Sequence, residues 1–357
     1  MKKISLLFYF ISIYSFAQHT AAPTGLTASK AMVVSAREEA SKIGVEIMKK
    51  GGNAFDAMVA TELALAVAYP YAGNIGGGGF MVYRKANGEI GSLDYREKAP
   101  LAATKDMFLD QNGKVIKGKS TESPLAIGVP GTIAGVFAVH KKLGSLPMSE
   151  IMKPVIVLAE KGVIVTRRQE RRLNDYRAEI IKVNGDKTLF ATIFKQNDTI
   201  KYPALAETLK RISKKGKNEF YKGKTAKILV KYLQQKGAII TRKDLSKYEA
   251  KWRTPLTFNY KDLKIISMPP PSSGGICLAE IMKMIAPYDL AKMGHNSAEA
   301  IQIIVEAERR AYADRSYYLG DPDFVKIPLK ALMDDAYLKQ RMSNFSFEKA
   351  TLSSEIK

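Results

Sequence analysis

The chain has 357 residues, of which 46% are hydrophobic and 25% are charged. This composition is typical of a folded protein and excludes a disordered chain, and the length allows one large domain or two ordinary ones. The net charge of +21 fits a protein that binds nucleic acid or another anionic surface, or an exported protein whose basic surface serves solvation. The basic residues are spread widely and mixed with acids, which favours an exported protein that does not bind nucleic acid.

Metal and disulfide chemistry have little support in the residue types. The one cysteine, Cys277, excludes an intrachain disulfide and a cysteine-based metal cluster, and its Ile–Cys–Leu setting predicts a small buried side chain. The three histidines, His19, His140 and His295, are far apart and lack the spacing of metal ligands. We therefore expect no metal and no cofactor.

The N-terminus has the pattern of a signal peptide. Lys2 and Lys3 precede an apolar run over residues 4–16, and Ser15-Phe16-Ala17 is a small-x-small cleavage pattern. The run is shorter than a transmembrane helix requires, and no cysteine follows it for lipid attachment. The sequence thus predicts a signal peptide over residues 1–17 and a mature protein that is periplasmic or secreted, without a stable membrane anchor.

Two helices are predicted next, followed by a glycine-rich hairpin. Ser35 and Glu38 form a capping-box pattern for the first helix, and Asn53 caps a second helix over residues 54–68 that is apolar nearly all round and therefore buried. Strands are predicted over residues 80–84 and 90–95, joined by an Asn-Gly turn. Four successive glycines precede the hairpin and allow close backbone approach: Gly76, Gly77, Gly78 and Gly79.

Arg96 directly follows the second strand of the predicted hairpin, and two interpretations of its role are open. An arginine at this place can hold a carboxylate through two parallel hydrogen bonds. It can also be a surface residue paired with Asp94 or Glu97. Residue chemistry alone favours the surface ion pair.

Residues 113–120 match the letters of a phosphate-binding loop. A polar turn precedes them instead of a buried strand, and Pro124 restricts helix entry after them. We interpret the match as chance. Further helices are predicted over residues 132–143, 149–161, 203–215 and 222–236, with a solvated helix over 166–182, a short one after Thr241, and strand-like residues over 252–268.

Three prolines at 269–271 predict an extended path into the helix 276–285, and a longer helix capped by Ser297 runs to Tyr317. The residues before the first of these helices expose backbone N–H groups and form either an anion site or a rigid corner: Ser272, Ser273, Gly274 and Gly275. In isolation the rigid corner is the favoured interpretation.

Several of these stretches, taken together and in order, resemble the γ-glutamyltranspeptidase (glutathione hydrolase) family. The resemblance extends from about Val33 to Lys357 and is carried by residues 74–81, 94–100, 269–275, 311–316, 319–324 and 353–357. It implies an α+β fold, the αββα sandwich of the N-terminal-nucleophile hydrolases. Residues 18–357 would be the large-subunit part of a single domain, incomplete without a C-terminal small subunit.

The resemblance also implies a substrate and site residues. Arg96 would hold the α-carboxylate of the γ-glutamyl group of glutathione or another γ-glutamyl compound, and water or an acceptor amino acid would take the acyl group. The glycines at 76–79 and residues 272–275 would shape the structure near the site. Glutathione catabolism and a zymogen that matures to a heterodimer follow from the same resemblance.

No catalytic nucleophile is recognisable in this chain. There is no Gly-x-Ser-x-Gly elbow and no histidine near a candidate serine. The family's precursor cuts itself before a threonine, which becomes the nucleophile, yet no Thr-His pair of that kind occurs here. We expect this threonine shortly after Lys357, at the start of the small subunit, and expect the chain to be inactive alone. An inactive fragment and a related amide acylase remain alternatives.

Overall fold

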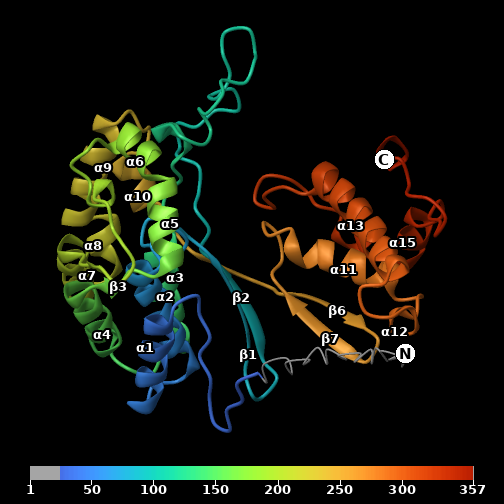
Figure 1. The fold of residues 1–357 in the computed structure, drawn as a ribbon, viewed down its shortest axis with the longest axis horizontal. Coiled ribbons are helices and arrows are strands. Elements are labelled where there is room, and N and C mark those ends of the chain that lie inside the picture. The colour runs from blue at the N-terminus through green and yellow to red at the C-terminus, as the bar shows by residue number, and fades with distance from the viewer. Residues whose placement is uncertain (1–24, 357) are drawn as a thin grey trace, which may run out of the picture.

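The computed structural model describes residues 25–356, so the predicted signal peptide lies outside the described residues. The chain is a mixed α+β structure with a helical body on one side of the β1–β2 hairpin and a C-terminal part on the other (Figure 1). The helical body contains α1 (Glu38–Lys49), α2 (Ala54–Ala68), α3 (Thr132–Leu143), α4 (Met148–Lys161), α5 (Arg167–Asp175), α6 (Arg177–Asn184), α7 (Pro203–Lys215), α8 (Lys217–Tyr221), α9 (Lys224–Gln235) and α10 (Arg242–Ser246).

The C-terminal part packs around two long helices. It contains α11 (Gly274–Ile285), α12 (Leu290–Met293), α13 (Ala298–Tyr318), α14 (Leu329–Leu332) and α15 (Asp335–Arg341). Three single-turn 3₁₀ helices complete the helical elements: Pro124–Ala126, Leu189–Ala191 and Ser353–Glu355.

The main sheet has the strand order β1-β2-β5 and is antiparallel throughout. Phe80 pairs with Asp94 across β1 (Phe80–Arg84) and β2 (Ile90–Asp94), and Leu93 pairs with Trp252 across β2 and β5 (Lys251–Arg253). Two-stranded sheets form from β3 (Val163–Ile164) with β4 (Thr199–Ile200), and from β6 (Leu256–Tyr260) with β7 (Leu263–Ser267). The predicted hairpin is present, and its turn places Gly88 at a φ of +88°.

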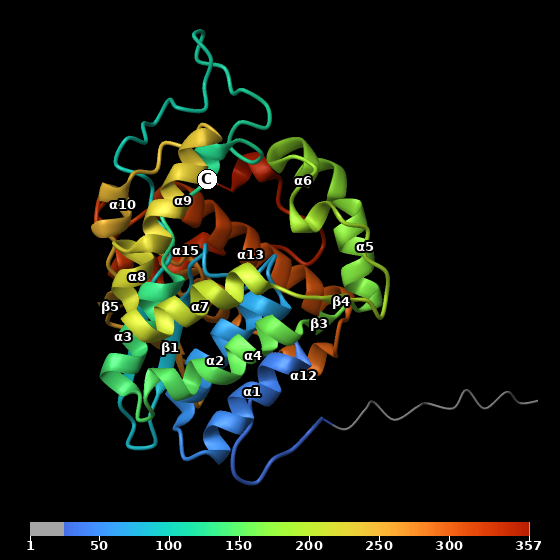
Figure 2. The same ribbon diagram turned by 90° about the vertical axis from the view of Figure 1, so that its left-hand side faces the viewer.

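Helix α2 is the centre of the main core. Asn53 caps it as predicted, accepting hydrogen bonds from two backbone N–H groups while Asp56 completes the capping box. Contacts run from α1 to α2, from α2 to α4 and from α4 to α7, and these four helices lie side by side in Figure 2. Helix α2 is buried on most of its surface, as a helix that is apolar all round should be.

Four local expectations are wrong. Helix α1 begins at Glu38 with Arg37 as its N-cap, and Ser35 instead bonds to the Arg37 carbonyl and to Ser41. The solvated helix breaks at Tyr176 into α5 and α6. The helix predicted at 276 begins two residues earlier, at Gly274. The proline run is not extended, because Ser272 N–H bonds to the Pro269 carbonyl and closes a turn.

Residues 113–120 lie in a loop that projects from the helical body (Figure 1). No strand precedes them and only a single 3₁₀ turn follows, so the context of a phosphate-binding loop is absent in this part of the described chain. Among residues 25–356, no helix is both long enough and apolar enough to cross a membrane.

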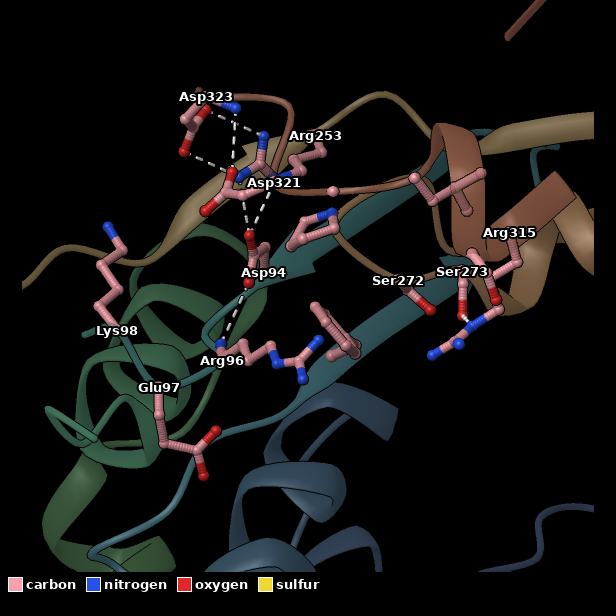
Figure 3. A pocket seen from close by; sticks show the side chains of 15 residues that line it. Asp94, Arg96, Glu97, Lys98, Arg253, Ser272, Ser273, Arg315, Asp321 and Asp323 are labelled. Atoms are coloured by element: carbon pink, nitrogen blue, oxygen red, sulfur yellow. Dashed lines mark hydrogen bonds and ion pairs between the residues drawn. The ribbon is translucent and has the colours of Figure 1, made fainter. Parts of the chain in front are cut away.

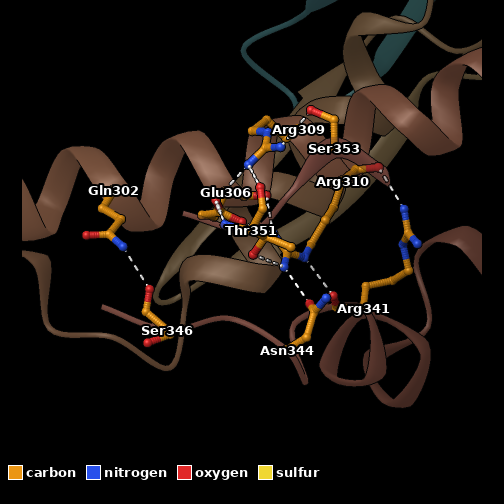
Figure 4. Close-up of polar contacts among 9 residues, drawn as sticks. All are labelled: Gln302, Glu306, Arg309, Arg310, Arg341, Asn344, Ser346, Thr351 and Ser353. Carbon is orange, nitrogen blue, oxygen red and sulfur yellow. Dashed lines mark hydrogen bonds and ion pairs between the residues drawn. The ribbon is translucent and has the colours of Figure 1, made fainter. Parts of the chain in front are cut away.

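A buried ion pair ties the C-terminal segment onto α13 (Figure 4). Arg310 and Glu306 are only 1% and 3% exposed and hydrogen bond to each other one turn apart. Arg310 also donates to the side chains of Asn344 and Thr351, at 2.6 and 3.1 Å, and Glu306 accepts from the Thr351 N–H at 3.0 Å. Burial raises the pKa of Glu306, but the bonds from Arg310 and Thr351 outweigh it and lower the pKa to about 2.

We expect Glu306→Gln to lower the free energy of unfolding at pH 7 by about 3 kcal/mol, because it leaves the Arg310 charge buried without a counter-charge. The depressed pKa of Glu306 means that its stabilisation is present above the unfolded-state value of about 4.3 and is lost as the pH falls toward about 2. Urea unfolding from pH 7 to pH 2 should therefore show a smaller loss for the variant. The exposed Glu348→Gln should follow the wild type, and an equal effect of both changes would contradict the assignment.

Candidate active site

A cavity of about 510 Å³ lies where the two parts of the chain meet (Figure 3). Its walls come from the end of β2, from β5, from the turn before α11, and from the end of α13 with the loop that follows. The lining residues include Asp94, Arg96, Glu97, Lys98, Arg253, Ser272, Ser273, Arg315, Asp321 and Asp323. The structure thus brings Arg96 together with the two serines, which are more than 170 positions away in the sequence.

The backbone of Arg96 is held at both ends. Its N–H donates to the carboxylate of Asp94 at 3.1 Å, and its carbonyl accepts from the hydroxyl of Tyr248 at 2.7 Å. Tyr248 stacks on Tyr221 with ring centroids 5.6 Å apart. Burial and the nearby Tyr221 raise the pKa of Tyr248, so its hydroxyl keeps the proton that it donates to Arg96.

The side chain of Arg96 is exposed and free to bind. Its guanidinium lies 6.0 Å from the centroid of the Phe80 ring, and within residues 25–356 it forms no hydrogen bond or ion pair. The expected alternative, a surface pair with Asp94 or Glu97, is not formed. Asp94 bonds to the backbone of Arg96 and not to its guanidinium.

Two acids in one wall of the cavity, Asp94 and Asp323, are held in linked ion pairs. Arg253 donates from Nε to Asp94 at 2.9 Å and from an Nη atom to Asp323 at 3.2 Å, and Lys251 bonds to Asp323 at 2.5 Å. Burial lowers the pKa of Arg253, but the hydrogen bonds that it donates to Asp323 and Asp94 outweigh this effect and raise the pKa. The bond from Lys251, followed by that from Arg253, lowers the pKa of Asp323. Both arginine and aspartate therefore stay charged at neutral pH.

The four glycines lie beside the backbone that carries Arg96 and do not line the cavity. The Gly77 carbonyl accepts from the N–H groups of Gly131 and Thr132, at 2.7 and 3.0 Å. A Cβ atom on Gly78 would lie 2.5 Å from the Tyr95 carbonyl oxygen, whereas one on Gly76 would meet nothing nearer than 3.4 Å. The run therefore permits the close packing that fixes residues 95–97.

The residues before α11 occupy the opposite wall. Ser272 accepts from the Gly274 N–H at 3.3 Å, and Ser273 accepts from Arg315 Nε at 2.9 Å. Gly274 is open, while a Cβ on Gly275 would lie 2.4 Å from the Met268 carbonyl oxygen. Ser272 and Ser273 therefore line the cavity, and Gly274 and Gly275 form the first turn of the helix behind them.

Within residues 25–356, the cavity has no pair of nucleophile and base. The hydroxyls of the three serines that line it, Ser272, Ser273 and Ser316, bond to no carboxylate, lysine or histidine of the described chain. His140 bonds to the Leu146 carbonyl at 2.7 Å, and Cys277 is buried as predicted, where burial and Glu280 raise the pKa of its thiol to about 11. Among the described residues, the cavity thus presents unpaired guanidinium groups, and its serine hydroxyls lack the hydrogen bond to a base that would activate them.

Sequence reasoning missed four residues of the site: Tyr248, Arg253, Arg315 and Asp323. The residues that pair with Arg96 and Asp94 lie 152 and 159 positions away, so no local pattern marks them. Arg315 and Asp323 stand inside stretches that carried the family resemblance, and this is the one signal that pointed to them.

Comparison with known proteins defines the class. A solved structure of Helicobacter pylori γ-glutamyltranspeptidase matches with a TM-score of 0.91 and 43% identity, over 93% of this chain and 97% of that one. The fold is that of the N-terminal-nucleophile hydrolases, as predicted.

The family model for γ-glutamyltranspeptidase matches residues 40–357. The chain belongs to the γ-glutamyltranspeptidase family. The glutathione hydrolase proenzyme of Escherichia coli is 44% identical over 92% of this chain, and an acylase ACY 1 proenzyme of a Pseudomonas species is 34% identical over 91%. The chain spans 58% and 60% of the lengths of these two relatives.

We expect Gly78→Ala to lower the free energy of unfolding by about 2 kcal/mol, because its Cβ would overlap the backbone of residues 95–97. Gly76→Ala is the matched control from the same run and should change stability by less than about 0.5 kcal/mol. Urea unfolding of both variants is the measurement. Equal stability of the two variants would show that close packing at Gly78 does not hold Arg96 in place.

Proposed function

We propose that this chain is the large-subunit part of a γ-glutamyltransferase or glutathione hydrolase, with the signal peptide at 1–17 and the domain part at 18–357. The observation that carries the proposal is the state of Arg96. Its backbone is held at both ends, and its guanidinium faces a cavity without a protein partner in the described chain. A guanidinium fork on a fixed backbone suits a carboxylate of a small ligand.

The chemistry requires a second polypeptide. A threonine at its N-terminus would attack the γ-carbonyl carbon of the substrate, and its α-amino group would accept the hydroxyl proton. The amide C–N bond then breaks, the leaving amine takes the proton, and a γ-glutamyl ester remains on the threonine. Water or an acceptor amine next attacks this ester and releases glutamate or a new γ-glutamyl amide. The absence of an activated serine in the described cavity supports a nucleophile from outside these residues.

Under this proposal Arg96 binds the α-carboxylate of the γ-glutamyl group. The glycines at 76–79 hold the backbone of Arg96, and Ser272 and Ser273 form the facing wall with Gly274 and Gly275 behind them. The protein would be exported to the periplasm or beyond, as its N-terminal pattern suggests. It would act on glutathione or other γ-glutamyl compounds.

An acylase acting on another amide is the second candidate, favoured by the 34% identity to an acylase proenzyme. The two functions differ in what Arg96 must recognise. A γ-glutamyl substrate always carries an α-carboxylate, while an acylase substrate need not carry one at that position. The dependence of activity on this carboxylate therefore separates them.

We expect Arg96→Gln in the complete two-subunit enzyme to raise KM for a γ-glutamyl anilide tenfold or more, with a smaller change in kcat. The reason is the loss of a charge-assisted interaction that contributes about 1.5–3 kcal/mol. Arg96→Lys should also be impaired, because an ammonium cannot form two parallel bonds. Steady-state kinetics of both variants are the measurement.

The matched control substrate is the 4-aminobutyryl anilide, which lacks the α-carboxylate and should be cleaved equally by wild type and Arg96→Gln. Arg84→Gln, an exposed arginine outside the cavity, should behave as wild type. An unchanged KM for the γ-glutamyl anilide in Arg96→Gln would remove Arg96 from substrate binding. Cleavage of the 4-aminobutyryl anilide as fast as that of the γ-glutamyl anilide would favour the acylase.

We also expect the chain to need its partner for solubility. An exposed apolar stripe on α13 carries Ile301, Val305 and Tyr312, which are 49%, 42% and 56% exposed. Produced alone, the chain should aggregate, and Ile301→Lys with Val305→Lys should reduce that aggregation, as measured by light scattering after size-exclusion chromatography. Val157→Lys on α4 is the control and should have no effect. A monodisperse wild-type chain would contradict this prediction.

The same partner can be sought directly. Native protein captured through this chain should contain a second polypeptide whose N-terminal residue is threonine, shown by intact mass and N-terminal sequencing. Capture of this chain with no second polypeptide would favour the inactive fragment.

A further inference from the structure

The cavity contains a second guanidinium that the proposed function has not used. Arg315 comes from α13, on the opposite side of the opening from Arg96 (Figure 3). Its Nε donates to Ser273 at 2.9 Å, and its guanidinium carbon lies 5.7 Å from the centroid of the Tyr312 ring. These contacts orient the group and leave both Nη atoms without an acceptor in the described chain.

The other charged groups of the cavity differ in how they are paired. Arg253 is bonded to Asp94 and Asp323, and Lys98 donates to the Glu249 carbonyl at 3.2 Å. The side chains of Glu97 and Asp321 also line the cavity and form no ion pair with another described residue. The charges left for a ligand in the described chain are therefore the guanidinium groups of Arg96 and Arg315 on facing walls, the ammonium group of Lys98, whose bond to a backbone carbonyl leaves its charge unpaired, and two carboxylates.

This set matches a zwitterionic ligand that has a carboxylate at each end and one ammonium group. A cavity of about 510 Å³ is within the usual range for small-molecule sites. If Arg96 takes the α-carboxylate of the γ-glutamyl half, the amine half of the substrate extends toward the wall that carries Ser273 and Arg315. A guanidinium with two free Nη atoms suits a planar carboxylate better than a neutral amide or an aromatic ring.

We propose that Arg315 binds the carboxylate of the amine half of the substrate, and that Ser273 holds its guanidinium in place. The inference rests on the proposed function and adds to it a residue that recognises the amine half of the substrate from the wall opposite Arg96. An acceptor amino acid would place its carboxylate on the same group, because acceptor and leaving amine pass through one subsite.

The test compares two substrates that differ in one charge. Glutathione and its C-terminal amide share the γ-glutamyl half and the peptide backbone, and the amide lacks the terminal carboxylate. In the complete two-subunit enzyme, kcat/KM for glutathione should exceed that for the amide by about tenfold or more, as a charge-assisted interaction implies. Arg315→Gln should reduce this ratio to about one, and Arg315→Lys should give an intermediate ratio.

Two variants serve as controls. Arg84→Gln should keep the wild-type ratio. Arg96→Gln should lower kcat/KM for both substrates alike and also keep the ratio, because it acts on the half that they share. The ratio, and not activity alone, is therefore the readout that a merely structural role of Arg315 would not change.

The possible results are distinct. An equal loss of kcat/KM on both substrates in Arg315→Gln, or an unchanged ratio, would overturn the role of Arg315 and leave it as a support for Ser273. A wild-type enzyme that cleaves both substrates equally well would overturn this inference while the proposed function stands. A wild-type enzyme that cleaves neither substrate would overturn the proposed function and this inference together.

Discussion

The site depends on one carboxylate, that of Asp94. One of its oxygens accepts the N–H of Arg96, and the other accepts from Arg253, which reaches Asp323 in the loop after α13. Asp94 and Arg253 are only 9% and 15% exposed, and burying either charge alone would be costly. The hairpin end, β5 and the loop after α13 are therefore held to one another through these charges. The helical body and the C-terminal part are joined at the place where the cavity forms.

This arrangement separates charges that build the wall from charges that face the ligand. The acids that Arg253 and Lys251 neutralise cannot repel a carboxylate, so they allow Arg96 to remain unpaired beside them. Tyr248 adds a contact that carries no charge, and it fixes the Arg96 carbonyl without competing for the guanidinium. The arginine is positioned through its backbone, which fixes the start of its side chain and leaves the guanidinium available for binding.

Local patterns in the sequence predicted local structure well. The Asn53 cap, the buried helix α2, the hairpin around Gly88 and the amphipathic helix α7 are all present, because each depends on interactions within a few residues. The errors in local structure arose where another hydrogen bond within a few residues replaced the expected one. Ser35 fails to cap α1 because its hydroxyl bonds elsewhere, and the proline run turns back toward α11.

The site was predictable only in part, because contacts between residues far apart in the sequence build it. Arg96 was proposed as a site residue because its neighbours in sequence resemble a known motif, and it lines one cavity together with Ser272 and Ser273. Tyr248 and Arg253 act through partners more than 150 positions away, and neither stands in a recognisable local pattern. The glycines at 76–79 were predicted near the site, but their role in packing against residues 95–97 follows only from the positions that Cβ atoms would occupy.

On the proposed function, recognition and bond cleavage belong to different polypeptides. The described chain supplies guanidinium groups on two walls and a rigid backbone beneath one of them, and an activated nucleophile would come from the second polypeptide. Substrate preference can then change through the residues of this cavity without any change in the nucleophile. Relatives named as glutathione hydrolases and as acylases share this scaffold at 44% and 34% identity, which such a division of roles would allow. The charge pattern of the cavity wall, more than the fold, would then decide which amide is cleaved.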